Sequence, residues 1–357
     1  ALPWVDKSVS VSRLHAYQRF LFPPADLTPF EAIDRLPVAQ ARTYDGDGSR
    51  YLNLPCYSRA RSVEIVETDI ADVEASLLQS IERQVVADVP VGISLSGGID
   101  SGLIAAGVRR LGHTDIRAFN LCFDDPAAAQ DSGVAKAIAD HCGLEIRVDS
   151  VTDDDFFDRF VRNIWLLDEP IGDPAYASCL RVSELAAKEV KVLLSGCGGD
   201  EVFGGYGHML QGGMLRLLNN VPSRALRRGL MRVAGVAESE RVLDGLADFN
   251  SKPWKCAAEA RTIGLEAGEP SRLEDHLYQI ASLGSNEKRQ NKSMRIEMAG
   301  YLEGQILPMF DRATMGFSIE GRVPLLDEFV VAAGFGLKAE LRGRDFGNGK
   351  PALRKIA

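Results

Sequence analysis

The spacing of hydrophobic residues changes close to residue 69. Before that point the apolar runs are short, and prolines and a glycine-containing turn at residues 45–48 interrupt them, which predicts loops and brief strands without a core of their own. After it, apolar side chains recur three or four positions apart as far as Pro90, which predicts an amphipathic helix. The residues that carry this spacing are Val73, Leu77, Leu78, Ile81, Val85 and Val86.

The next hundred residues alternate between short apolar runs and helical patterns. Strands are predicted at residues 91–95, 116–123, 144–148 and 191–194. Helices are predicted between them, at residues 102–110 and 132–141. This alternation predicts βαβ units and therefore an α/β fold, a parallel sheet flanked by helices. Residues 221–336 follow a mostly helical pattern, so we expect a helical C-terminal extension.

Composition excludes several classes of protein. The 357 residues are 45% apolar and 25% charged, as expected for one large globular domain with a smaller addition. A net charge of -9 without any basic block argues against a nucleic-acid partner. No apolar stretch approaches the roughly 20 residues of a membrane span, so we expect no membrane contact. Six scattered cysteines without a C-x-x-C pair predict reduced thiols and a cytoplasmic protein.

A glycine-rich loop follows the strand predicted at residues 91–95. Residues 96–101 read Ser-Gly-Gly-Ile-Asp-Ser and lead into a helix. Adjacent glycines let several backbone N–H groups approach one anion, and the start of the helix adds positive potential. Asp100 would repel a phosphate unless a cation lay between them, which favours Mg²⁺. A plain glycine turn that ends a strand is the alternative.

A second glycine-rich loop repeats this plan after the strand predicted at residues 191–194. Residues 195–201 read Ser-Gly-Cys-Gly-Gly-Asp-Glu. Because the carboxyl ends of parallel strands meet at one edge of a sheet, we expect the two loops to define a crevice. Asp100 and Asp200 would then face the same hard cation. As an alternative, Asp200 and Glu201 form the N-cap and acidic first turn of a helix, and the two roles are compatible.

These motifs resemble the asparagine synthetase family. The first loop is similar to the pyrophosphate loop of the N-type ATP pyrophosphatases and lacks the Lys-Ser/Thr ending of the kinase-type P-loop. The second loop, with residues 203–206 (Phe-Gly-Gly-Tyr) after it, is similar to the matching family segment. Further similarity lies at residues 168–170, 311–315, 320–327 and 350–354.

The resemblance covers residues 58–357 and implies a domain organisation. Those residues would form an adenine-nucleotide α-hydrolase-like (PP-loop) sheet domain. Residues 1–57 resemble the end of the glutamine amidotransferase domain that precedes it in the family, followed by a linker. The family also has a charge-stabilising lysine loop beyond residue 357. We therefore expect this piece to be truncated and weakly active or inactive alone.

The resemblance also implies the site residues. Those for the adenosine part of ATP are Leu95, Leu121, Ser195 and Gly196. Those for the pyrophosphate are Ser96, Gly97, Gly98, Asp100 and Ser101. Asp100 and Asp200 would share Mg²⁺. The substrate pocket would contain Cys197, Gly198, Glu201, Tyr206 and Arg312.

Three basic residues have two interpretations each. Arg312 and Arg322 are candidates to clamp a carboxylate or phosphate, with structural ion pairs as the alternative. Lys350 is a candidate for the pyrophosphate, with a solvated lysine as the alternative. Tyr206 and Trp165 are expected in the interior or along the wall of the cleft.

The resemblance implies an ATP-dependent carbon–nitrogen ligase. It would adenylate a small carboxylate, aspartate first among them, release pyrophosphate, and transfer ammonia from glutamine, which requires the N-terminal amidotransferase domain. The products would be asparagine or a related amide and AMP. Residue 197 departs from the pattern, because Cys197 stands where asparagine-forming members carry glutamate. A homodimer is compatible with the sequence.

Three alternatives stay open. Cys197 favours an amine nucleophile, as in β-lactam synthetases or peptide macrolactam cyclases. A catalytically inactive nucleotide-binding scaffold is the second alternative, and intact Asp100 and Asp200 count against it. The third, tRNA modification, is disfavoured by the acidic balance of the chain.

Overall fold

The computed structural model describes most of the chain in separate stretches. These are residues 3–11, 13, 14, 17, 22, 27–38, 40–45, 48–53, 65–123, 126–169, 171–206, 221, 223–233, 289–338, 341 and 349–357. They fall into two compact units. The first takes its residues from Ala1–Val63, Gly204–Gln305 and Asp345–Gly349, and the second from Glu64–Phe203, Ile306–Arg344 and Lys350–Ala357.

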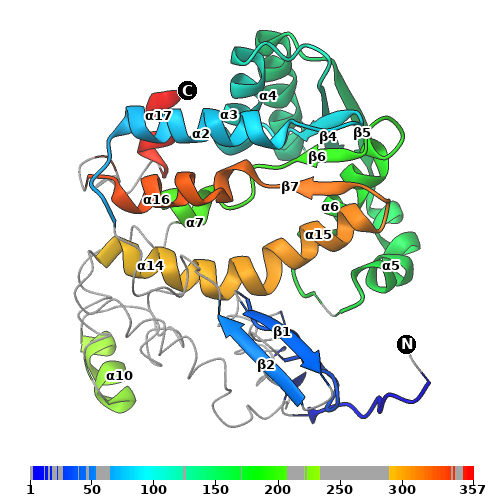
Figure 1. The fold of residues 1–357 in the computed structure, drawn as a ribbon, viewed down its shortest axis with the longest axis vertical. Coiled ribbons are helices and arrows are strands. Elements are labelled where there is room, and N and C mark those ends of the chain that lie inside the picture. Colours follow the sequence, from blue (N-terminus) through cyan, green and yellow to red (C-terminus); the bar gives the residue numbers. More distant parts are fainter. Residues whose placement is uncertain are drawn as a thin grey trace. The chain divides into compact units, whose positions relative to one another are not determined.

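The second unit contains a five-stranded parallel sheet in the order β5-β4-β3-β6-β7. Ile93 pairs with Ala118 on one side and with Leu194 on the other, so β3 is central. The chain adds strands on one side of β3 and then crosses to the other, which confirms the predicted α/β fold (Figure 1). The strands are β3 (Val91–Ser94), β4 (Arg117–Phe123), β5 (Ile146–Val151), β6 (Val192–Leu194) and β7 (Glu320–Arg322).

Helices cover both faces of this sheet. Figure 1 shows α2 and α3 on one side of it and α15 on the other. Residues of α6, α15 and the sheet form one buried cluster that contains Phe119, Leu193 and Phe310. The helices of this unit are α2 (Ile70–Gln84), α3 (Ile99–Arg110), α4 (Pro126–Cys142), α5 (Asp153–Leu167), α6 (Ala175–Ala186), α7 (Gly199–Phe203), α15 (Leu307–Met315), α16 (Glu328–Gly336) and α17 (Pro351–Ile356).

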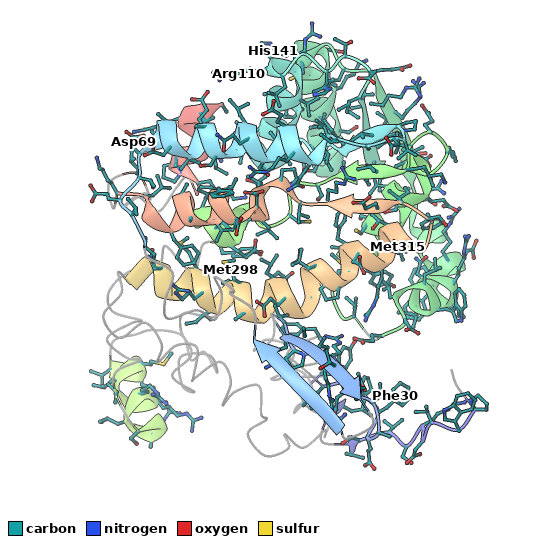
Figure 2. The ribbon with its side chains drawn as sticks, in the orientation of Figure 1. Phe30, Asp69, Arg110, His141, Met298 and Met315 are labelled. Carbon is teal, nitrogen blue, oxygen red and sulfur yellow. The ribbon has the colours of Figure 1, made fainter. Side chains whose placement is uncertain are left out.

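The predicted amphipathic helix is α2, and its ends follow from local chemistry. The Asp69 carboxylate accepts hydrogen bonds from the backbone N–H groups of Ala71 and Asp72, and the Asp72 carboxylate accepts one from the Asp69 backbone N–H, forming a capping box. Val73 and Ile81 are among its buried residues. Figure 2 labels Asp69 at the start of this helix.

The first unit contains an antiparallel hairpin of β1 (Gln40–Asp45) and β2 (Gly48–Asn53), which agrees with the brief strands expected there. Its described helices are α10 (Arg224–Val233), α14 (Arg289–Glu297) and most of a π-helix, Met298–Ile306. The predicted helical pattern of residues 221–336 fails at β7, which is a strand of the second unit's sheet. Residues 234–288 of that pattern lie outside the described residues. The assignment of residues 1–57 to an amidotransferase end stays a prediction.

Among the described residues, no helix has the length and apolar character needed to cross a membrane. The expectation that Trp165 lies in the interior or along a cleft is wrong, because this side chain on α5 is 77% exposed.

Candidate functional site

The two glycine loops meet beside β3, where the order in which the chain adds strands to the sheet reverses. Strands β3 and β6 are parallel neighbours, so residues 96–98 and 195–198 leave the same edge of the sheet. A side chain at Gly196 would place its Cβ 2.8 Å from the Ser101 backbone nitrogen, and one at Gly199 would lie 2.5 Å from the Asp100 carboxylate. Only glycine permits these approaches. The crevice expected at this topological switch point is therefore formed by two loops in direct contact.

Internal hydrogen bonds shape the first loop. The Ser101 hydroxyl accepts from the Ser96 backbone nitrogen at 3.2 Å, and the Ser96 hydroxyl accepts from Gly98 N–H at 3.3 Å. Gly97 has φ +86°, a conformation that favours glycine, and a Cβ there would lie 2.6 Å from the Asp131 carbonyl oxygen. Gly98 begins α3 without a side-chain cap. The N-terminal backbone N–H groups of α3 therefore suit the binding of an anion.

Lys350 links the two acidic residues of the loops. Its Nζ forms an ion pair with Asp100 and lies 2.9 Å from Oδ1 of Asp200. The ammonium is 9% exposed at the side-chain level, and the Lys350 backbone is left-handed at φ 59°. The structure thus brings together three residues predicted from the sequence, with the Lys350 ammonium between the two carboxylates.

Asp100 keeps an unused oxygen in this cluster. Its Oδ1 is buried and has no hydrogen-bond partner in the structure. Burial raises the pKa of the Asp100 carboxyl, and the adjacent Lys350 ammonium opposes this rise. Two carboxylates and one ammonium leave the cluster one negative charge in excess when all three are ionised.

The donor set suits Mg²⁺ that also binds phosphate. Among the described residues, no group of three or more His, Cys, Asp or Glu side chains could hold a metal alone. Mg²⁺ commonly takes one or two carboxylates and completes its octahedron with phosphate oxygens and water. Asp100 and Asp200 already converge on one cation, and Asp100 Oδ1 is unused. The residues present therefore fit a magnesium–phosphate site.

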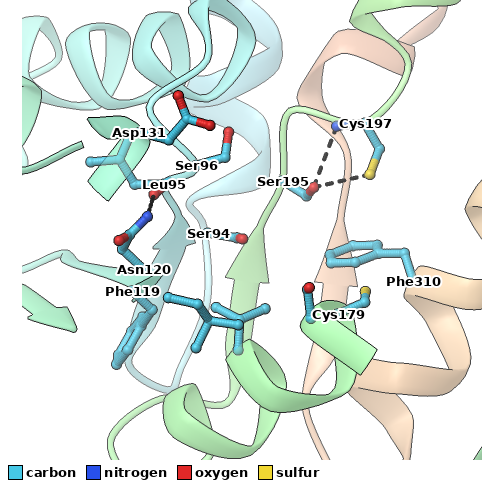
Figure 3. Close-up of a pocket in the computed structure, with 13 residues that line it drawn as sticks. Ser94, Leu95, Ser96, Phe119, Asn120, Asp131, Cys179, Ser195, Cys197 and Phe310 are labelled. Atoms are coloured by element: carbon cyan, nitrogen blue, oxygen red, sulfur yellow. Dashed lines mark hydrogen bonds between the residues drawn. The ribbon is translucent and has the colours of Figure 1, made fainter. Parts of the chain in front are cut away.

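A cavity of about 300 Å³ opens beside the loops, at the carboxyl ends of β3, β4 and β6 (Figure 3). Four of the residues predicted for the nucleotide line it: Leu95, Ser96, Leu121 and Ser195. Its inner part is mostly apolar, with Phe119, Val182 and Phe310 among the lining residues. An apolar cavity next to an anion-binding loop suits a purine nucleotide.

Asn120 is a site residue that the sequence prediction missed. It is 5% exposed, lines the cavity from β4, and donates a hydrogen bond from Nδ2 to the Leu95 carbonyl oxygen at 2.7 Å. That bond fixes the residue that precedes the first loop, as Figure 3 shows. The available signal was a polar residue inside a predicted buried strand, where an amide must have a partner.

Two cysteines face the same cavity. Cys197 Sγ lies 3.1 Å from the Ser195 hydroxyl, and Cys179 reaches the cavity from α6. Burial raises the pKa of Cys197 to about 11, although its hydrogen bond with Ser195 opposes the rise. Burial also raises the pKa of Cys179, and Cys197 adds to that effect. Both thiols are therefore neutral near pH 7 and unsuited to act as bases.

The other residues predicted for the substrate pocket belong to different elements. Gly198 has φ +94° and packs on Leu326. Glu201 is buried on α7 and contributes to the raised pKa of Cys197, so its carboxylate lies near the thiol. Tyr206 belongs to the first unit, where its ring packs edge-on against Tyr301 at 6.2 Å.

The two arginines have structural partners. Arg312 on α15 forms an ion pair with Glu169 at 3.0 Å. The Arg322 guanidinium pairs with Glu320 and donates to the carbonyl oxygens of Gln84 and Val86, at 2.6 and 2.9 Å. Neither arginine lines the cavity. These contacts favour the structural interpretation of both residues.

The comparisons with known proteins agree with the site. The family model described as asparagine synthase matches residues 72–357. Asparagine synthetase [glutamine-hydrolyzing] 1 of Bacillus subtilis is 27% identical over 366 residues, 99% of this chain and 57% of that protein. A Mycobacterium bovis protein provisionally named asparagine synthetase [glutamine-hydrolyzing] is 32% identical over 278 residues, 75% of this chain and 42% of that protein.

A solved structure is a more distant match. The NH3-dependent NAD synthetase from Campylobacter jejuni is 16% identical with a TM-score of 0.30, over 65% of this chain and 96% of that one, which is too low to bear on the assignment. This chain spans about half the length of the two curated relatives. The family model alone covers well over half of the chain. The chain therefore belongs to the asparagine synthase family.

Proposed function

We propose that this chain carries the adenylating part of an ATP-dependent, amide-forming ligase. The observation that carries the proposal is the convergence of Asp100 and Asp200 on the Lys350 ammonium, beside a glycine loop and an apolar cavity. Each feature matches one part of magnesium-bound ATP. The acidic pair suits the Mg²⁺, the glycine loop suits the triphosphate, and the apolar cavity suits the purine. Membership of the asparagine synthase family supports the same reaction class.

In the first step a carboxylate oxygen of the substrate attacks the α-phosphorus of ATP. The bond from that phosphorus to the bridging oxygen breaks, and pyrophosphate leaves with the electron pair. The backbone N–H groups at the start of α3 and the Ser96 hydroxyl would bind the departing phosphates. Asn120, through Leu95, would keep the loop aligned while this charge moves.

Charge balance in that step would come from the acidic pair and Lys350. Mg²⁺ bound at Asp100 and Asp200 would neutralise phosphate charge. The Lys350 ammonium, already between these carboxylates, would then be available to pair with pyrophosphate. The clamp role predicted for Arg322 is not part of this proposal, because its guanidinium is committed to backbone carbonyls and Glu320.

In the second step a nitrogen nucleophile attacks the acyl carbon, AMP leaves, and the nitrogen loses a proton. We propose aspartate as the acid and ammonia as the nucleophile, delivered from glutamine by an amidotransferase domain, because the relatives are named glutamine-hydrolysing asparagine synthetases. We also propose a cytoplasmic location. The described cysteines Cys142, Cys179 and Cys197 are thiols outside any disulfide, and such thiols persist in a reducing compartment.

A second candidate keeps the adenylation and replaces ammonia with an amine carried by a substrate. Cys197 favours it, because a thiol with a pKa of about 11 cannot take the proton that ammonia loses. This candidate differs from the first in the nitrogen nucleophile and therefore in the product.

The test is carboxylate-dependent exchange of labelled pyrophosphate into ATP, measured on the complete protein with aspartate, other amino acids and no acid. Exchange with aspartate supports asparagine formation. Exchange with another acid alone keeps the reaction class and replaces the product. Asp100→Asn is the matched variant and should abolish exchange without loss of fold. Nucleotide binding without any exchange would favour the inactive scaffold and contradict the proposal.

A further inference from the structure

Two polar side chains lie on one side of the cavity beside the glycine loops. Asn120 comes from β4 and Asp131 from α4, and both line the cavity. Figure 3 shows them on the same side as Leu95, whereas Cys179 and Cys197 lie on the other side. Because the cavity is mostly apolar, each polar group in it constrains strongly which ligand can enter.

Asn120 has one amide group in use and one unused. Its Nδ2 donates to the Leu95 carbonyl oxygen at 2.7 Å, which fixes the orientation of the amide. Its Oδ1 is buried and has no hydrogen-bond partner in the structure, and the residue is 5% exposed. Buried polar atoms normally have a partner, so a donor that comes with a ligand explains this oxygen.

Asp131 adds a second acceptor to this side of the cavity. A carboxylate at neutral pH accepts hydrogen bonds and cannot donate them. The other polar or sulfur-containing lining residues are four serines and two cysteines, and a hydroxyl can either donate or accept. Asp131 and the Oδ1 of Asn120 are therefore the lining groups that distinguish a donor on the ligand from an acceptor.

The purine bases differ in the group at position 6. Adenine carries an amino group with two N–H donors there, whereas guanine and hypoxanthine carry a carbonyl oxygen. A base held against Leu95 and Leu121 lies beside Asn120, because Asn120 and Leu121 are consecutive on β4. Oxygen acceptors at this position attract an amino group and repel a carbonyl oxygen.

We propose that Asp131 and Asn120 select adenine over other purines by accepting hydrogen bonds from its 6-amino group. The inference rests on the proposed function, because it requires that the cavity holds the base of ATP. Asn120 then acts twice, since it aligns the first loop through Leu95 and recognises the base through Oδ1. A hydrogen bond to a charged group contributes about tenfold to a hundredfold in affinity, so this recognition is measurable.

The test compares three nucleotides on the complete protein by isothermal titration: AMP, purine riboside 5′-monophosphate and IMP. Purine riboside lacks the 6-amino group, and IMP has an oxygen in its place. The wild type should bind AMP at least about tenfold more tightly than purine riboside monophosphate, and IMP more weakly still. Equal affinities for AMP and purine riboside monophosphate would overturn the inference and leave nucleotide binding intact. A protein that binds no AMP would overturn both the inference and the proposed function.

Asp131→Asn separates recognition of the base from a structural role. The new amide keeps the size of the side chain and can turn an N–H towards the oxygen of IMP. The preference for AMP over IMP should therefore fall at least about tenfold. Asp140→Asn is the matched control, at an exposed aspartate of the same helix outside the cavity, and should leave the preference unchanged. Equal weakening of all three nucleotides in Asp131→Asn would overturn the role of Asp131.

Asn120→Leu removes both functions of the amide. Loss of the hydrogen bond to Leu95 should weaken all three nucleotides by a common factor. Loss of Oδ1 should in addition reduce the ratio of the AMP affinity to the purine riboside monophosphate affinity, which loop alignment alone would not change. An unchanged ratio would overturn the role of Asn120. Far-UV circular dichroism verifies the fold of each variant, and Asp131 is exposed, so its variant tests the inference even where the buried Asn120 tolerates no change.

Discussion

At the residue scale, Lys350 holds a position between the two carboxylates that we propose as magnesium ligands. In Lys350→Met these carboxylates lose their internal counter-charge, and added Mg²⁺ no longer competes with an ammonium. Without nucleotide, the variant should bind Mg²⁺ about tenfold more tightly than the wild type, equivalent to ~1.4 kcal/mol. Pyrophosphate binding should change in the opposite direction, because a phosphate partner is lost. Isothermal titration with magnesium chloride and with pyrophosphate measures both.

The control for this experiment is Lys355→Met. Lys355 lies on the same short helix, α17, but its side chain is exposed. Its removal should leave both affinities unchanged. Equal magnesium affinities in the wild type and in Lys350→Met would contradict the competition between ammonium and metal.

Cys197 gives a prediction that depends on pH. Burial raises the pKa of this thiol to about 11, so the reactive thiolate is about a thousandth of the population at pH 8. Alkylation by iodoacetamide should be slow at pH 7 and should accelerate about tenfold for each pH unit as far as pH 10. The modified peptide is followed by mass spectrometry.

Ser195→Ala provides the comparison for Cys197. The hydrogen bond with Ser195 lowers the pKa of the thiol, so its removal should raise that pKa and slow alkylation further at any given pH. Rapid labelling of Cys197 in the wild type at pH 7 would contradict a neutral thiol and reopen its role as a base.

Single residues differ in how well the sequence predicts them. The two glycine loops were expected to define one crevice, because they follow parallel strands, and in the structure Gly196 and Gly199 leave no room for a side chain beside Asp100. The Lys350 ion pairs were not predictable, since 250 positions separate Lys350 from Asp100 and no local pattern links them. Trp165 was misplaced because the aromatic character of one side chain does not decide its burial, and this one lies on an exposed face of α5.

At the element scale, Arg322 ties β7 to the end of α2. Its guanidinium donates to the carbonyl oxygens of Gln84, the last residue of α2, and of Val86, and it pairs with Glu320. Arg322→Met removes these donors and leaves the carbonyls without them. The free energy of unfolding should fall by about 1–3 kcal/mol, and the affinity for AMP should stay close to that of the wild type. Urea denaturation and AMP titration measure the two quantities.

Arg110→Met is the matched control for Arg322. Arg110 is 64% exposed at the side-chain level and pairs only with Glu74 among the contacts described for it, so its loss should change stability by less than about 1 kcal/mol. If Arg322→Met instead lost nucleotide affinity at unchanged stability, the clamp interpretation would be correct.

The elements show why one strand escaped prediction. The strands β3, β4 and β6 coincide with the mostly apolar runs that a buried parallel strand requires. Strand β7 is three residues long, Glu-Gly-Arg, and pairs only with β6 at the edge of the sheet. Its sequence has neither alternation nor apolar character, so the helical pattern around it prevailed. Only the partner strand specifies it as a strand.

At the scale of the whole molecule, the site described here lies within one unit. The loops, the acidic pair, Lys350 and the cavity all belong to the second unit, together with β7 from a distant part of the chain. The sequence motifs lie on the sheet of this unit, so local patterns were enough to predict its fold. Tyr206 belongs to the first unit, and its place in the substrate pocket stays a prediction.

The location of the site predicts where ligand binding will stabilise the protein. AMP with magnesium pyrophosphate, supplied at about 100 times its dissociation constant, should stabilise the folded state by about 2.7 kcal/mol. Hydrogen exchange followed by mass spectrometry should show slower exchange in the loops at residues 96–101 and 195–199 and in α3. Helix α10 of the first unit should exchange at its original rate. Asp100→Asn should lose the protection of both loops together, because each loop then lacks its shared cation. Protection confined to one loop would contradict a site in which Asp100 and Asp200 act on the same phosphates.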